Sequence, residues 1–316
     1  MLAGSAAAAG HLVLPPLAPL LLGALGLLAA MGVGAYWLGS APFAFLVAGV
    51  AHGLGGGRLA PLPVWGAAAL LGLYAAAVAL LARRRPRRAL GPTDGFLAVG
   101  LMVLLSACFS LLAPVPPPGP TERHVSVLLV LYLATPPIEM LTVILVLSRD
   151  RLLGRFWREN YRGRAGLAGA IGHGLVVGIG IVLLTAAVVQ IEARGFRWPI
   201  QPNNPFVYNP RLATAPPGAL AALVLAVVVM APLAEEALFR GLLYGGLRSR
   251  VGPVLAALVS AAVFGAAHMN GSLFLPLAVA GFLLALVYER SRSLWPSTVA
   301  HATLNGLAVL MALLVR

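Results

Sequence analysis

Five polar side chains in the last third of the chain have types and spacing that could carry out acid–base chemistry within apolar helices. Glu235 and Glu236 directly follow an uncharged apolar run. His268 closes a second apolar stretch, and His301 and Asn305 lie within a third. A glutamate carboxyl in an apolar setting can take a proton from water and return it. Ionisable groups inside a membrane are costly, so they are usually paired or functional.

The two adjacent glutamates are expected to have different partners. Two neighbouring carboxylates are difficult to keep ionised together, so a cation should lie close to one of them. Arg240 follows Glu236 by four residues, which places both side chains on one face of a helix. We therefore predict a structural Glu236–Arg240 pair. Glu235, rotated by about 100° around the helix, is left free to act as a general base.

The spacing along the chain predicts that these side chains meet. Val251–Gly252–Pro253 has the composition of a helix turn, and Glu235 and His268 lie at nearly equal distances on either side of it. In two straight helices each would be about 24 Å from the turn. His301 and Asn305 are four residues apart and share a helix face. We expect these four side chains to reach a similar depth from three separate segments.

Three short motifs in this region resemble the signature of one enzyme family. They are Glu235-Glu236-x-x-x-Arg240, Phe264-x-x-x-His268 and His301-x-x-x-Asn305. Their order, their separations and their apolar surroundings make residues 217–316 similar to the CPBP family of intramembrane proteases, which includes CAAX proteases and bacteriocin-processing enzymes. Residues 1–216 show no such resemblance and are predicted to be an N-terminal transmembrane accessory bundle beside the catalytic core.

The resemblance implies a glutamic-type mechanism without a cofactor. Glu235, helped by His268, would activate a water for attack on a peptide carbonyl. His301 and Asn305 would donate hydrogen bonds to the resulting oxyanion. The resemblance gives three further residues a supporting role, namely Glu236, Arg240 and Phe264.

A zinc-dependent mechanism is the alternative for the same residues, because members of the family have also been described as metalloproteases. Glu235, His268 and His301 could form a His₂Glu zinc set with one open position. We favour the metal-free version because His301 and Asn305 face the same point, as an oxyanion clamp would.

The elements that must position these residues are apolar helices. Of the 316 residues, 60% are hydrophobic and only 10% are charged, whereas a soluble domain has about 25% charged residues. Runs of about 20 apolar residues are long enough to cross a bilayer. Together they predict an all-α, polytopic transmembrane bundle of eight or nine spans. The apolar stretches are 15–38, 62–82, 95–114, 125–147, 168–190, 217–240, 253–270 and 273–315, the last divided at Glu289–Pro296.

The net charge of +13 comes from arginines in the links between these stretches and does not indicate nucleic acid. Clusters at 83–88, 149–164, 240–250 and 290–292 all fall on one side of the predicted topology. The positive-inside rule places that side, and the N-terminus, in the cytosol. The lysine-free, arginine-rich composition suggests a bacterial inner (plasma) membrane protein. Its expected partners are the lipid bilayer and a membrane-associated or C-terminally anchored peptide substrate.

Other polar residues in the membrane zone leave alternatives open. Glu139 and His173 could pair with each other, line a substrate entry or mark an ion path. The chain could then be a proton-coupled transporter, or a non-catalytic scaffold for other membrane proteins. Gly174 and Gly178 have the spacing of a helix-packing motif.

Overall fold

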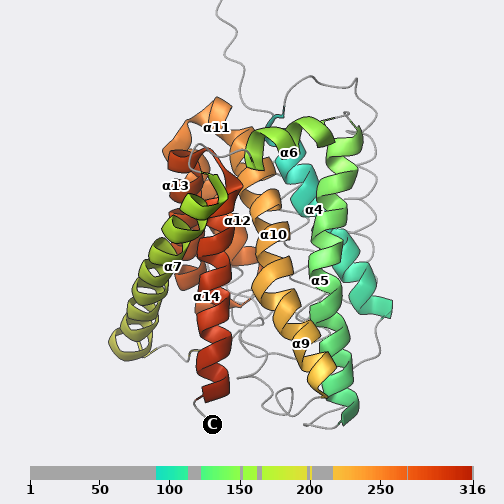
Figure 1. Ribbon diagram of the computed structural model, residues 1–316, viewed down its shortest axis with the longest axis vertical. Coiled ribbons are helices and arrows are strands. Elements are labelled where there is room, and N and C mark those ends of the chain that lie inside the picture. Colours follow the sequence, from blue (N-terminus) through green and yellow to red (C-terminus); the bar gives the residue numbers. More distant parts are fainter. Residues whose placement is uncertain are drawn as a thin grey trace, which may run out of the picture.

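The chain is helical throughout the part that the structure describes. This computed structural model describes residues 90–112, 122–149, 152–161, 166–197, 200, 216–268 and 270–314, and no strand occurs within them. The all-α prediction is therefore confirmed for these ranges (Figure 1). The helices before residue 216 are α4 (Pro92–Leu112), α5 (Glu122–Arg149), α6 (Leu153–Tyr161), α7 (Gly166–Gln190) and the short π-helix η1 (Ile191–Gly195). Those of the last third are α9 (Pro217–Leu225), η3 (Ala226–Met230), α10 (Ala231–Glu235), η4 (Glu236–Tyr244), α11 (Gly245–Val251), α12 (Pro253–Ala267), η5 (Gly271–Leu273), α13 (Phe274–Ser291) and α14 (Leu294–Leu314).

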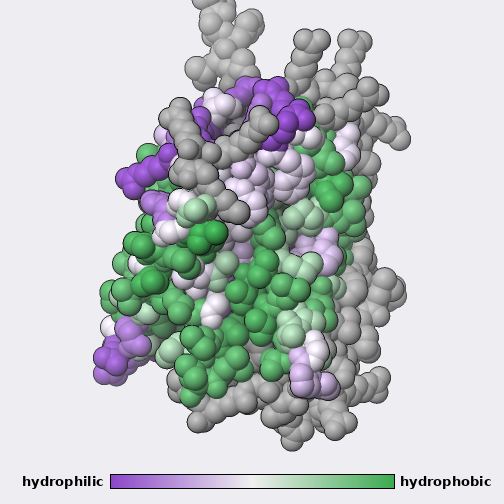
Figure 2. Space-filling model, in the orientation of Figure 1, coloured by the Kyte–Doolittle hydropathy of each residue, from purple (hydrophilic) through white to green (hydrophobic). Residues whose placement is uncertain are grey.

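Four of the described helices are long and apolar enough to cross a membrane. They are Ala168–Gly195, Pro217–Val251, Gly271–Ser291 and Leu294–Leu314. A fifth span arises if the bent pair Tyr132–Ser148 and Leu153–Tyr161 is taken as one. The expected total of eight or nine is not confirmed, and the predicted stretches 15–38 and 62–82 lie outside the described residues. Figure 2 shows an apolar surface over most of one face, with hydrophilic residues gathered at its top and at the lower end of α7. This is the surface of an integral membrane protein.

The helix that carries the two glutamates changes its winding several times. Pro217–Val251 is continuous, but η3 and η4 are π-helical and α10 lies between them. Pro232, in the first turn of α10, has no backbone N–H and interrupts regular hydrogen bonding. The helix ends at Gly252, whose φ of 79° is a conformation that glycine adopts without strain. The predicted turn at this point is confirmed.

Helices α12 and α13 pack against each other as a hairpin, and α12 is the shorter of the two. The 15 residues of α12 extend about 22 Å, which is shorter than the roughly 30 Å hydrocarbon core. The turn at Asn270–Ser272 is sheltered, because Ser272 is buried and its hydroxyl donates to the Asn270 amide oxygen at 2.8 Å. Burial in protein is what a polar turn at this depth requires. His268 thus lies at the inner end of a short helix.

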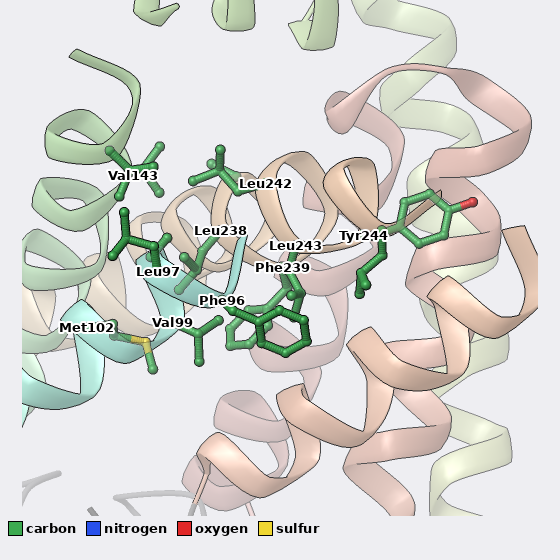
Figure 3. Close-up of a cluster of buried hydrophobic side chains, with 14 of the residues drawn as sticks. Phe96, Leu97, Val99, Met102, Val143, Leu238, Phe239, Leu242, Leu243 and Tyr244 are labelled. Atoms are coloured by element: carbon green, nitrogen blue, oxygen red, sulfur yellow. The ribbon is translucent and has the colours of Figure 1, made fainter. Parts of the chain in front are cut away.

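A single apolar core joins the residues on both sides of position 216. Phe96, Leu97 and Val99 of α4 and Val143 of α5 are buried against η4. Figure 3 shows these side chains around the buried η4 side chains, and the η4 residues that it labels are Leu238, Phe239, Leu242, Leu243 and Tyr244. The helix that bears the catalytic candidates is therefore held rigidly by helices from the N-terminal part of the chain.

The glycine motif of α7 packs within the molecule. A Cβ added at Gly174 would lie 2.6 Å from the side chain of Val299, and one at Gly178 would lie 2.6 Å from that of Thr303. Both neighbours belong to α14, so the two glycines allow the backbones of α7 and α14 to approach closely. The prediction of a helix-packing motif is confirmed.

The arginine-rich link after α5 contains a helix, α6, that the sequence reading did not identify. It is bent by 115° from the preceding helix and lies across the top of the bundle (Figure 1). Phe156 is buried, whereas Arg155 and Glu159 face outward and form an ion pair. The helix is therefore amphipathic, with one face against the bundle and the other polar.

Candidate active site

Glu235 and the two predicted histidines meet in the interior of the bundle. The distance from Glu235 Oε2 is 3.8 Å to His301 Nε2 and 4.0 Å to His268 Nε2. The Glu235 side chain is 12% exposed, and its Oε2 has no hydrogen-bond partner among the described residues. Helices α10, α12 and α14 thus bring three groups capable of proton transfer to one point. For Glu235 and His268 this agrees with their nearly equal distances along the chain from the turn at Gly252.

Glu236 has two polar partners, one on its own helix and one on α14. Its Oε1 accepts from Arg240 Nη1 at 2.8 Å and lies 2.9 Å from Nδ1 of His301. Arg240 also donates from Nη2 to the carbonyl of Gly281 on α13 at 3.1 Å. Glu236 and Arg240 are completely buried, so each charge requires its partner. The predicted Glu236–Arg240 pair is present, and through His301 it also orients the site.

Phe264 lies at the centre of the group rather than beside it. Its ring centroid is 4.7 Å from that of His268 and 5.7 Å from that of His301. The guanidinium carbon of Arg240 lies 4.5 Å above the same ring. This buried aromatic ring fixes both imidazoles and makes a cation–π contact with the arginine.

Asn305 makes a contact that the sequence did not predict. Its Nδ2 donates to the carbonyl oxygen of Val227 at 2.9 Å. In the π-helical register the donor to Val227 would be residue 232, a proline without an N–H. One hydrogen of the Asn305 amide therefore satisfies this carbonyl, and the second is left for another acceptor.

The hydrogen bonds at Nδ1 indicate what Nε2 of each imidazole can do: accept a proton in His268 and donate one in His301. His268 Nδ1 lies 2.8 Å from the carbonyl oxygen of Phe264, which can only accept, so Nδ1 carries the hydrogen. In the neutral ring, Nε2 of His268 can then accept a proton on the side of Glu235. His301 likewise carries a hydrogen on Nδ1 toward Glu236. Its Nε2 donates when the ring is also protonated there.

The zinc alternative is not matched by this arrangement. The donor types are suitable, and imidazoles held by a carboxylate and a carbonyl resemble those of metal sites. In the part of the chain that the structure describes, however, no three His, Cys, Asp or Glu side chains are grouped closely enough to hold a metal ion. This geometry therefore gives no support to a metal-dependent step.

Glu139 lies beside this site, which the sequence did not reveal. It is 6% exposed on α5, which packs against α10, the short helix that ends at Glu235 (Figure 1). His173 is exposed on α7 and makes no ion pair with Glu139 within the described residues. The suggested Glu139–His173 pair is therefore wrong. Only the position of α5 against α10 could have revealed this neighbour.

Comparison with known proteins supports the resemblance drawn from the three motifs. Residues 217–307 match the family described as type II CAAX prenyl endopeptidase Rce1-like. The matched segment contains α9 to α14 as far as residue 307 and includes every candidate site residue except Glu139. The last third of the chain is thus similar to a family of endopeptidases.

A curated relative is similar to part of the chain. It is the Bacillus subtilis protein named "Putative membrane peptidase YdiL", which is 31% identical over 85 residues. The alignment covers 27% of this chain, and the chain spans about a third of the relative's length, 35%. No solved structure matches the chain.

Proposed function

We propose that this protein is an intramembrane endopeptidase that hydrolyses peptide bonds of membrane-associated or C-terminally anchored substrates. The observation that carries the proposal is the position of Glu235 Oε2, unpartnered within the described residues and within 4.0 Å of two imidazole Nε2 atoms. A water between these atoms would have a carboxylate and an imidazole to take its proton. The match of residues 217–307 to CAAX endopeptidases supports the same activity.

In the proposed reaction Glu235, assisted by His268, takes a proton from water. The hydroxide attacks the peptide carbonyl, and the carbonyl oxygen becomes an oxyanion. Glu235 then returns the proton to the nitrogen of the leaving amine as the C–N bond breaks. The carboxylate therefore ends the cycle as it began, and no cofactor is consumed.

His301 and Asn305 are the proposed oxyanion donors. His301, held at Nδ1 by Glu236, would donate from Nε2 when that nitrogen carries a hydrogen. Asn305 would donate the amide hydrogen that does not bond to Val227. Removing one donor of this kind costs about 3–4 kcal/mol of transition-state stabilisation.

The orientation of the bundle in the membrane is also a proposal. The end of the bundle with Arg248, Arg250, Arg290 and Arg292 would face the cytosol of a bacterium, with the active site reached from within the bilayer. The substrate would then be a segment that is already in the membrane or anchored to it.

The test is to identify membrane-peptide termini by mass spectrometry in cells that express wild type, Glu235→Gln or His268→Ala. We expect a set of wild-type termini that is absent from both variants, although all proteins insert equally. Glu159→Gln, which changes an exposed carboxylate on α6, is the matched control and should retain the termini. Equal cleavage by wild type and both site variants would refute the proposal. Activity that persists with a chelator would favour the metal-free version, and loss restored by zinc would contradict it.

A further inference from the structure

The carboxyl of Glu139 has no assigned role, although it is one of the most deeply placed acids in the described chain. It is 6% exposed, and its Oε2 is buried without a hydrogen-bond partner among the described residues. An isolated buried carboxylate is strongly unfavourable, so such groups are paired, neutral or functional. No cation lies within salt-bridge distance of Glu139 in the described ranges, in contrast to Glu236.

Glu139 lies on the face of α5 that packs against the glutamate helix, because Val143, four residues later, is buried against η4. Pro136 and Pro137 interrupt α5 one turn earlier, and the Thr142 hydroxyl donates to the carbonyl of Glu139 at 2.6 Å. Helix α5 packs against α10, whose last residue is Glu235. Glu139 and Glu235 thus present two buried, unpartnered carboxyl oxygens on helices that pack against each other.

Two such carboxyls cannot both be ionised at low cost, so one of them holds a proton. Glu235 Oε2 lies 3.8 Å from Nε2 of His301, which can donate to a negative charge when it carries a hydrogen. Glu139 has no comparable partner. The proton therefore resides on Glu139, and the charge on Glu235.

We propose that Glu139 is a positioning residue of the active site, a carboxylic acid that stays protonated and donates its O–H toward Glu235, directly or through one water. The inference rests on the proposed function, because it assigns Glu235 as the base. Glu139 keeps its proton throughout the reaction, and the proton removed from water goes to Glu235 and then to the leaving amine. Its contribution is to keep Glu235 ionised and oriented.

The test compares Glu139→Gln with Glu139→Met in the full chain in liposomes, using a peptide whose cleavage has been identified by its new termini. Gln keeps a neutral donor, so it should rescue kcat to within about threefold of wild type. Met fills a similar volume without a donor, so kcat should fall about 10- to 100-fold, as expected for loss of a hydrogen bond to a charged group. KM should not change in either variant, because the substrate does not contact Glu139. Glu192→Met, at a partly buried carboxyl near the end of the α7 span, is the matched control and should leave kcat unchanged.

Two outcomes of the cleavage measurements would overturn this inference while leaving the proposed function intact. If both variants lose cleavage as completely as Glu235→Gln, Glu139 carries protons and does not merely hold one. If both cleave at the wild-type rate, it is a spectator. Infrared spectroscopy gives a readout independent of cleavage: the carbonyl stretch of a buried protonated carboxyl should disappear in Glu139→Gln and persist in Glu192→Gln. A band that persists in Glu139→Gln would also overturn the inference, even if no substrate were ever cleaved.

Discussion

At the level of single residues, the Glu236 carboxylate links three helices through its partners. It accepts from Arg240 on its own helix and bonds to His301 on α14, while Arg240 reaches the Gly281 carbonyl on α13. A buried pair of this kind contributes little compared with an apolar pair, but removal of one member leaves an uncompensated charge. The pair therefore matters most for keeping His301 in place.

We expect Arg240→Met to lower the free energy of unfolding by about 3–5 kcal/mol, because Glu236 loses its cation and the Gly281 carbonyl loses a donor. Urea titration of the detergent-solubilised protein would measure this change. Arg155→Met is the control, since Arg155 pairs with Glu159 on the exposed face of α6 and its loss should cost at most about 1 kcal/mol. Equal effects of the two substitutions would show that the interior pair is not required.

The sequence predicted one of the two Glu236 contacts, and the difference has a physical reason. A spacing of four residues within one helix fixes the Glu236–Arg240 contact locally. The contact with His301 depends on how α14 is rotated against η4, and no local pattern encodes that rotation. The same holds for Glu139, whose approach to Glu235 depends on the placement of α5.

At the level of elements, the winding of the glutamate helix depends on Pro232 and on a side chain from another helix. Because residue 232 has no N–H, the Val227 carbonyl is left for Asn305. Stretches of π-helix are rare and often occur at functional sites. Here they precede and follow Glu235, so the site and the irregular winding coincide.

This relation predicts coupling between Pro232 and Asn305. Asn305→Leu should cost about 1–3 kcal/mol in the parent protein, because the buried Val227 carbonyl loses its donor. In a Pro232→Ala background the new N–H can bond to that carbonyl, so the same change should cost less than about 1 kcal/mol. A double-mutant cycle of unfolding free energies measures the coupling, and strictly additive values would contradict it.

Which elements could be predicted depended on how strong their pattern was. Each apolar stretch from residue 95 onward corresponds to a helix, and the break between α13 and α14 falls at Arg292–Ser293, within the predicted Glu289–Pro296 division. Helix α6 was overlooked because its arginines suggested a loop. Phe156 and Trp157 lie between Arg155 and Arg158, and this mixture of apolar and charged residues is typical of an amphipathic helix.

At the level of the whole molecule, the two polar ends of the apolar surface differ in charge. The end formed by α11 and by the α13–α14 junction carries Arg248, Arg250, Arg290 and Arg292. Glu289 accepts from Arg248 and Arg292 there, which still leaves an excess of positive charge. The opposite end, where α5 begins and η1 ends, has Arg123, Arg194 and Arg197 within the described residues.

Selective labelling of two single cysteines would determine the orientation. In a Cys108→Ala background, Ser249→Cys marks the arginine-rich end and Phe196→Cys marks the other; both positions are exposed. The positive-inside rule predicts that a membrane-impermeant maleimide labels position 196 in intact cells and position 249 only after the membrane is opened. Neither substitution removes an arginine, so the charge bias that sets the topology is preserved. Labelling of 249 but not 196 in intact cells would reverse the topology and place the arginine-rich end of the bundle outside the cytosol.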